Sequence, residues 1–96
     1  MKKEDILNFL QQNRDYLRNN FSVEKIGIFG SYAKEKATNN SDIDFYVILK
    51  NKTLDNMTSL WIYLEKKFNK KVDIIYHHPR LREGLKKQIE KEVIYG

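Results

Sequence analysis

The chain has 96 residues, of which 41% are hydrophobic and 32% charged, with no cysteine and a formal net charge of +5. A chain of this length supports one modest core, so we expect a single domain over residues 1–96 with no room for a separate substrate-binding domain. The absence of cysteine excludes disulfides, thiol catalysis and a thiolate zinc site. No apolar run approaches the roughly 20 residues of a membrane-spanning helix, and the segment MKKEDILNFLQQN lacks the apolar centre of a signal peptide, so we expect a cytoplasmic protein.

The positive charge raises the question of nucleic-acid binding, which requires clustered lysine and arginine. The charges are spread along this chain, and the densest group, in residues 65–71, coincides with the expected end of a helix. Lysines at that position complement the helix dipole. The sequence therefore favours a solvated helix end over a nucleic-acid patch.

The first half of the chain predicts one helix and two strands. Apolar residues recur close to the 3.6-residue period over residues 3–19, which indicates an amphipathic helix. Residues 25–29 form a short β-branched and aromatic run that ends at Gly30, as a strand before a tight turn does. A second strand is predicted over residues 42–49, before the polar sequence KNK.

The second half predicts a helix, a strand and a last helix. Apolar residues at spacings of three and four indicate a helix over residues 54–68, in which Trp61 is expected to anchor the core. Residues 71–77 read as a third strand. Pro79 is typical of a first helical turn, so we expect a last helix that carries apolar residues up to Val93 and ends near Tyr95.

These elements predict an α/β (α+β) fold with the order α-β-α-β-α-β-α, if the residues after Gly30 form a short helical turn. Strands two and three are joined through a helix and are expected to be parallel. The short link between strands one and two allows an antiparallel or a looser pairing. The result is a small mixed sheet with helices on one face.

Two aspartates at the start of the second strand carry the first functional signal. Side chains alternate along a strand, so Asp42, Asp44 and Tyr46 project from one face while Ile43 and Phe45 project from the other. The two aspartate Cα atoms would lie roughly 6.5 Å apart, close enough for both carboxylates to reach one divalent ion. Strand propensity does not explain them, because aspartate is depleted in strands.

A third acid, Asp73, interrupts the apolar run VDIIYHH in the third strand. If strands two and three are neighbours, Asp73 can join Asp42 and Asp44. Three convergent carboxylates repel one another unless a cation is bound, so the arrangement suits magnesium, which takes oxygen ligands and shares its shell with substrate phosphates. Two such ions about 4 Å apart can stabilise both the attacking and the leaving oxygen of a phosphoryl transfer.

The pair Gly30-Ser31 suits phosphate binding. Glycine turns the chain without a steric penalty and admits a phosphate close to the backbone, and the start of a short helix through Tyr32 and Ala33 offers unpaired N–H groups. An isolated Asp-x-Asp or Gly-Ser is more often an ordinary turn. Their combination with a third acid on a neighbouring strand favours a nucleotide site with the triphosphate held between them.

The stretch GSYAKEKATNNSDIDFYV, followed by VDIIY, resembles the signature of the polymerase-β-like nucleotidyltransferases, G-S-x-A-x-G, a spacer and S-D-x-D, with a later acidic strand residue. The chain length and the extent of the resemblance suggest the minimal nucleotidyltransferase group, which includes the antitoxins paired with HEPN-domain toxins.

This resemblance implies catalytic and metal-binding roles for Asp42, Asp44 and Asp73, and nucleotide contacts by four residues: Gly30, Ser31, Lys34 and Ser41. It implies two Mg²⁺ ions and ATP as the substrate. It also implies transfer of AMP to a tyrosine hydroxyl of a HEPN-domain toxin, which silences the RNase activity of that toxin, so this chain would be the antitoxin. Homo- or hetero-oligomers are compatible with the sequence.

The sequence departs from the family pattern at Lys34-Glu35, where arginine and glycine are usual. Lysine keeps the charge but lacks the planar fork that grips a phosphate, and Glu35 replaces a conformationally free residue with a negative charge. Two alternatives therefore stay open. One is a weak or inactive member that neutralises its partner by contact, and the other is a nucleotidyltransferase that acts on RNA or on a small molecule.

Two further groups of residues are assigned lesser roles. His77 and His78 are adjacent on a strand and point to opposite faces, so they are not expected to chelate one ion together. Tyr46 shares the face of the aspartates, and burial in the core is the expected role.

Overall fold

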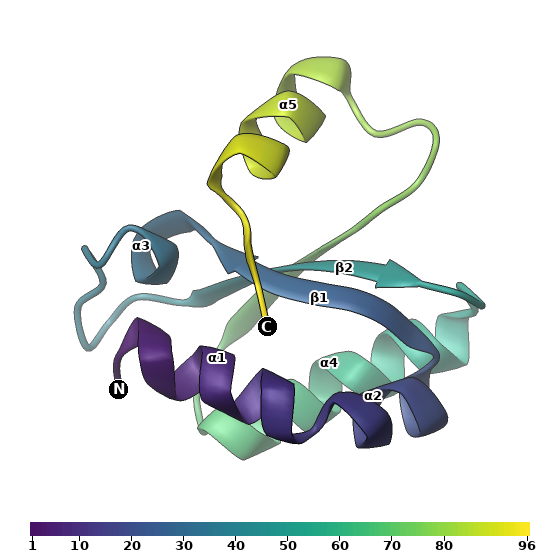
Figure 1. Ribbon diagram of the computed structural model, residues 1–96, viewed down its shortest axis with the longest axis horizontal. Helices are drawn as coiled ribbons and strands as arrows, with labels where there is room; N and C mark the ends of the chain where they lie inside the picture. Colours follow the sequence, from purple (N-terminus) through teal and green to yellow (C-terminus); the bar gives the residue numbers. More distant parts are fainter.

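The computed structural model describes residues 1–96, which form a four-stranded sheet and five helices (Figure 1). In chain order the elements are α1 Lys3–Gln12, α2 Arg14–Phe21, β1 Val23–Phe29, α3 Gly30–Ala33, β2 Ile43–Leu49, α4 Leu54–Phe68, β3 Val72–Tyr76, α5 Glu83–Glu92 and β4 Ile94–Tyr95. None of the helices combines the length and the apolar character needed to cross a bilayer.

The sheet is mixed and has the strand order β3-β2-β1-β4. Strands β2 and β3 are parallel, as predicted, and β1 pairs with β2 in the antiparallel sense. The predicted alternation is also confirmed, because Ile43, Phe45 and Val47 of β2 are all fully buried, whereas Asp44 between them is only half-buried. The mixed α/β fold predicted from the sequence is therefore the fold observed.

The main core lies between the sheet and three helices, α1, α2 and α4, which cover one face (Figure 1). Leu10 and Leu17 of the first two helices and Leu60 and Leu64 of α4 are at most 1% exposed. Trp61 packs against this core but remains half-buried, so it contributes to the core without being its centre.

The helix predicted over residues 3–19 is divided in two at Asn13. The Asn13 side-chain amide donates to the carbonyl oxygen of Phe9 at 2.9 Å, where its own backbone N–H also donates. Asparagine competes in this way for backbone acceptors and favours helix ends. The break redirects the chain so that Phe21, at the end of α2, also reaches the core.

The prediction that helices cover only one face of the sheet is wrong. Helix α5 lies on the opposite side from α1, α2 and α4 (Figure 1). Tyr46 on this second face and Ile89 of α5 are each 2% exposed, and both lie outside the main core cluster. Tyr46 is thus buried, as expected, but in a second and smaller apolar layer.

Both ends of the last helix also differ from the prediction. Pro79 lies in a turn, and α5 begins only at Glu83, because residues 77–82 form the connection from the sheet to the second face. Tyr95 does not end the helix. It belongs to β4, a two-residue strand that pairs with β1 at Gly27 and Ile28. A strand so short leaves no period-2 pattern to detect.

Candidate active site

Asp44 and Asp73 are paired in the register of the parallel strands β2 and β3. Because paired residues on neighbouring strands project to the same face, the two carboxylates emerge side by side on the face opposite the main core. Burial raises the pKa of the Asp44 carboxyl above its usual range, and the negative charges of Asp73 and then Asp42 raise it further. The structure therefore brings the three predicted acids into electrostatic contact.

Gly30 lies against Asp44 of this acidic group, which consists of Asp42, Asp44 and Asp73. It follows β1, whose last residue, Phe29, is paired with Asp44 across the antiparallel ladder. Gly30 has a φ of +72°, and a Cβ atom at this position would collide with the carboxylate of Asp44. Both the backbone conformation and the close approach require glycine, which explains why the turn has this residue beside the acid.

The helical turn α3, which includes Ser31, starts at Gly30 and covers only four residues. Ser31 is half-buried, and its carbonyl oxygen accepts a hydrogen bond from the Lys36 N–H at 2.9 Å. The predicted strand–turn–helix order around Gly30-Ser31 is therefore present. Whether the amides of this turn bind phosphate stays a prediction.

Asp42 and Ser41 lie in the loop that leads into β2. Asp42 is exposed, one residue before the strand begins, and is therefore less constrained than Asp44. The Ser41 hydroxyl accepts a hydrogen bond from the Thr38 N–H at 2.9 Å, and the Ser41 N–H donates to the Thr38 carbonyl at 3.0 Å. The visible role of Ser41 is to close this turn, and nucleotide binding by its side chain stays a prediction.

Glu35 keeps the backbone conformation that a glycine would adopt, with a φ of +59°. Its carboxylate lies 3.5 Å from the Lys3 ammonium nitrogen, on the side of the loop that faces the start of α1. The departure from the family pattern therefore does not abolish the turn, and the Glu35 charge has a partner outside the acidic group.

Lys34 is the other departure from the family pattern, and its side chain contacts α5, the helix that covers the second face of the sheet. Its Nζ lies 3.2 Å from Oε1 of Glu92, in the last turn of α5. This ion pair joins the loop after Gly30 to the helix that covers the second face. The nucleotide contact predicted for Lys34 stays a prediction.

The three acids have the chemistry of a magnesium site. Carboxylate oxygens are the ligands that Mg²⁺ prefers, and none of Asp42, Asp44 and Asp73 takes part in an ion pair with a lysine or arginine. Their mutual repulsion is thus left for a cation to relieve. No three acidic or histidine side chains are arranged to hold one ion together. The predicted convergence of Asp42 on Asp44 and Asp73 is therefore not observed, because Asp42 lies exposed in the loop before β2 and not in the strand.

Two contacts near this site leave no local signal in the sequence. Lys70, after α4, donates from its Nζ to the Asn39 carbonyl oxygen at 2.9 Å, and the same Nζ lies 5.9 Å from the centre of the Tyr32 ring. It thereby ties the loop before Asp42 to α3. Lys70 and Asn39 are 31 residues apart, so only the tertiary fold brings them together.

The two histidines make separate contacts. Nδ1 of His77 lies 2.8 Å from the Tyr46 hydroxyl oxygen, in the layer beneath α5. Nδ1 of His78 accepts a hydrogen bond from the Arg80 N–H at 3.1 Å. The two histidines follow β3, which ends at Tyr76, and are not adjacent on a strand as predicted. That they do not chelate one ion together stays a prediction.

Comparison with known proteins places the chain in a family. The model of the family described as "Polymerase beta, Nucleotidyltransferase" matches residues 11–96. The protein adenylyltransferase MntA of Thermococcus cleftensis is 33% identical over 93 residues, which cover 96% of this chain and 93% of that relative. The chain therefore belongs to the polymerase-β-like nucleotidyltransferase family.

Solved structures agree on the fold. A structure described as a minimal nucleotidyltransferase has a TM-score of 0.74 at 26% identity. The match covers 98% of this chain and 95% of the chain in that structure. A toxin–antitoxin structure with AMP-PNP has a TM-score of 0.68 at 21% identity. The match covers 99% of this chain and 72% of the chain in that structure. The match to the minimal nucleotidyltransferase structure therefore extends along nearly the whole length of both chains.

Proposed function

We propose that the protein is an Mg²⁺-dependent protein adenylyltransferase that acts as an antitoxin, transferring AMP from ATP to a tyrosine hydroxyl of a HEPN-domain toxin in the cytoplasm. The observation that carries the proposal is the pairing of Asp44 with Asp73 beside the turn at Gly30. Membership of the family supports a nucleotidyl transfer. The name of the Thermococcus cleftensis relative supports a protein as the acceptor.

In this proposal the acidic group and the Gly30 turn bind opposite ends of the reacting phosphates. Asp42, Asp44 and Asp73 would hold Mg²⁺. When bound, the metal would neutralise phosphate charge and make the α-phosphorus a better electrophile. Ser31 and the amides after Gly30 would bind the triphosphate tail, with Lys34 and Ser41 nearby.

The chemical step is an in-line displacement at the α-phosphorus. A bond forms between the acceptor oxygen and phosphorus, the bond to the oxygen that bridges to the β-phosphate breaks, and pyrophosphate leaves. Asp73 accepts the proton of the acceptor hydroxyl and later releases it to water. Asp73 suits this role because it is exposed on the strand face that Asp44 shares.

Labelled ATP tests the proposal. The protein is incubated with Mg²⁺, ATP labelled in the α-phosphate and the purified product of the neighbouring gene. We expect label on that product, and none with the Asp42→Asn, Asp44→Asn double variant. Asparagine keeps the size of each side chain but removes its negative charge.

The same double variant distinguishes AMP transfer from neutralisation of the toxin by binding alone. If it still protects cells from the toxin as well as the natural sequence does, the protein neutralises its partner by binding alone. If label reaches RNA or a small molecule instead of the partner protein, the acceptor class is wrong although the transfer is right. Equal labelling by the double variant would show that the acids are not the catalytic group.

A further inference from the structure

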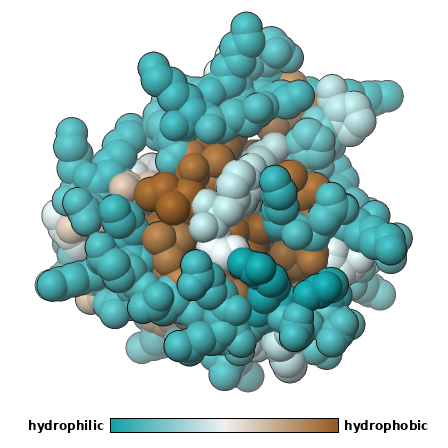
Figure 2. Space-filling model, viewed as in Figure 1, coloured by the Kyte–Doolittle hydropathy of each residue, from teal (hydrophilic) through white to brown (hydrophobic).

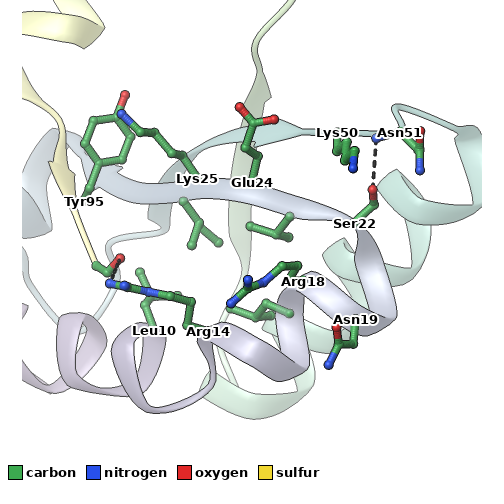
Figure 3. A pocket seen from close by; sticks show the side chains of 14 residues that line it. Leu10, Arg14, Arg18, Asn19, Ser22, Glu24, Lys25, Lys50, Asn51 and Tyr95 are labelled. Carbon is green, nitrogen blue, oxygen red and sulfur yellow. Dashed lines mark hydrogen bonds between the residues drawn. The ribbon is translucent and has the colours of Figure 1, made fainter.

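A groove of about 800 Å³ runs between β1 and the pair of helices α1 and α2 (Figure 3), and Asp42, Asp44 and Asp73 are not among the residues that line it. Its floor is apolar and consists of Leu10, Leu17, Val23 and Ile26, which also belong to the main core. Figure 2 shows apolar residues gathered in the middle of this face and surrounded by polar ones. A hollow of this size is within the range of ligand sites, which span roughly 300–1,000 Å³.

The upper wall of the groove is an open sheet edge. Strand β4 pairs with β1 only at Gly27 and Ile28, and the Gly96 N–H extends the ladder by one hydrogen bond to the Ile26 carbonyl oxygen at 3.0 Å. No strand lies outside residues 23–25 of β1. An unpaired edge presents backbone donors and acceptors that can pair with another extended chain.

The rim of the groove is basic. Arg14, Arg18, Lys25 and Lys50 line it, and Glu24 is the one acidic side chain among the lining residues. In Figure 3 the two arginine side chains reach from α2 towards the space beneath β1. Four cations from three segments of the chain, namely α2, β1 and the loop after β2, thus surround one apolar floor.

The contacts that these cations make within the protein are weak. A nitrogen of Arg14 lies 3.4 Å from the Gly96 carbonyl oxygen, and Arg18 pairs at 2.6 Å with Asp15, whose side chain is 87% exposed. Nζ of Lys25 lies 5.0 Å from the centre of the Tyr95 ring. Exposed pairs of this kind contribute about 0–1 kcal/mol, so the cations can exchange them for the carboxylates of a ligand at little loss.

Protection of the edge explains only part of this arrangement. The pairing of β1 with β2 is irregular between Val23 and Lys25, and bulges and charged residues on edge strands discourage unwanted pairing. Such protection accounts for Glu24 and Lys25. It does not account for cations contributed by α2 and by the loop after β2, nor for an apolar floor beneath them.

We propose that the groove binds an extended acidic segment of a partner protein, which adds as a strand to the outer edge of β1 beyond β4. Its backbone would pair with residues 23–25, alternate apolar side chains would lie on the floor, and its carboxylates would face the basic rim. A second copy of this chain fits poorly, because it would bring the same cations to the same place. The proposal does not depend on AMP transfer, because the acidic group takes no part in the groove.

Synthetic peptides test the chemistry of the ligand. The probe is a fluorescent peptide of about ten residues in which glutamate alternates with valine, titrated with the full chain to about 1 mM. Four comparison peptides are used. One replaces glutamate with lysine, one replaces valine with serine, and two carry N-methyl groups on alternate residues, each in one of the two registers. We expect saturable binding of the probe, and roughly tenfold or greater weakening for the first two peptides and for one of the methylated registers.

Charge reversal tests the location. The variant Arg18→Glu, Lys50→Glu should weaken binding of the probe by roughly tenfold or more. The matched control is Lys66→Glu, Lys87→Glu, which changes the net charge equally at exposed positions outside the groove and should bind within about twofold of the natural sequence. Thermal unfolding of both variants shows whether each is folded, and amide shifts at residues 23–25 report the site directly.

Five results would overturn the proposal, and the first four concern binding. These four are no saturable binding of the probe, equal binding of the serine peptide, equal weakening by the two charge-reversed variants, and a single-stranded oligonucleotide that displaces the probe and binds more tightly. The fourth result would assign the groove to nucleic acid. A dimer at working concentrations that dissociates in the Arg18→Glu, Lys50→Glu variant would assign it to a second copy.

Discussion

Asp44 of β2 and Asp73 of β3 are neighbours in a parallel ladder, so their two carboxylates share one face of the sheet. Neither carboxylate forms an ion pair with a lysine or an arginine. Burial and the charges of the other two acids raise the pKa of Asp44. A sheet gains nothing in stability from this arrangement, because like charges on directly opposed residues are destabilising. The pair is better explained by a ligand that neutralises it.

Magnesium should therefore stabilise the natural sequence and not the Asp44→Asn variant. At a metal concentration ten times the dissociation constant, the gain in unfolding free energy is about 1.4 kcal/mol, because the ion binds only the folded chain. Urea unfolding with and without millimolar Mg²⁺ measures it. An equal gain in the variant would place the bound ion elsewhere.

The Gly30→Ala variant should lose activity and about 1–3 kcal/mol of stability, because alanine is strained at a φ of +72° and its Cβ would meet the Asp44 carboxylate. Gly84→Ala is the matched control. Gly84 lies in α5 with nothing within 4 Å of an added Cβ, so alanine there should stabilise the protein by roughly 0.5–1 kcal/mol. Similar effects of the two changes would contradict the close contact between Gly30 and Asp44.

Glu35→Gly should stabilise the protein by up to about 1 kcal/mol, because the left-handed conformation at φ +59° strains a residue that has a Cβ. The lost ion pair with Lys3 is exposed and counts for little. Glu35→Ala removes the same charge but keeps the strain, so it should not stabilise. Equal unfolding free energies for the glycine and alanine variants would show that the conformation carries no penalty.

Alkaline pH should destabilise the fold through Tyr76. Burial raises the pKa of Tyr76 to about 12, and its hydroxyl donates to the Met57 carbonyl oxygen at 2.8 Å. In the unfolded chain a tyrosine has a pKa of about 10. Above that pH the unfolded chain releases the proton while the folded chain retains it, so stability present below pH 10 is lost as the pH rises towards 12.

The Tyr76→Phe variant tests this pH dependence. It should be less stable at pH 8 by about 1 kcal/mol, because it lacks the hydrogen bond. Its unfolding free energy should then fall less steeply between pH 9.5 and 11.5 than that of the natural sequence. Other tyrosines retain some slope, since partial burial also raises the pKa of Tyr46, Tyr63 and Tyr95. Parallel curves would show that Tyr76 titrates normally in the folded protein.

Regular patterns in the sequence predicted most of the fold around the acids. The alternation along β2 gave the faces of Asp44 and Phe45, and the helical connection to β3 gave the parallel pairing that brings Asp73 alongside. These features follow from local periodicity and chain connectivity, which any single sequence displays. The pairing of Asp44 with Asp73 beside the Gly30 turn was thus predictable, whereas Asp42, predicted as part of the strand, lies one residue before it.

Features set by tertiary contacts were not predictable in the same way. The break at Asn13 interrupts an otherwise continuous helical pattern, and β4 has only two residues. The orientation of Glu35 towards Lys3 joins residues 32 positions apart, which no local pattern encodes. Helix α5 covers the second face because the connection after His77 leads there, and its starting point at Glu83 rather than near Pro79 follows from the same path.

The most direct test of the central claim is the intact mass of the partner protein after incubation with unlabelled ATP, Mg²⁺ and this protein. The account predicts a mass increase of one or more AMP units, placed on tyrosine by peptide fragmentation, and an unmodified partner when the Asp44→Asn variant is used. An unmodified partner with the natural sequence, under conditions in which toxicity is nonetheless neutralised, would contradict AMP transfer as the function of the site.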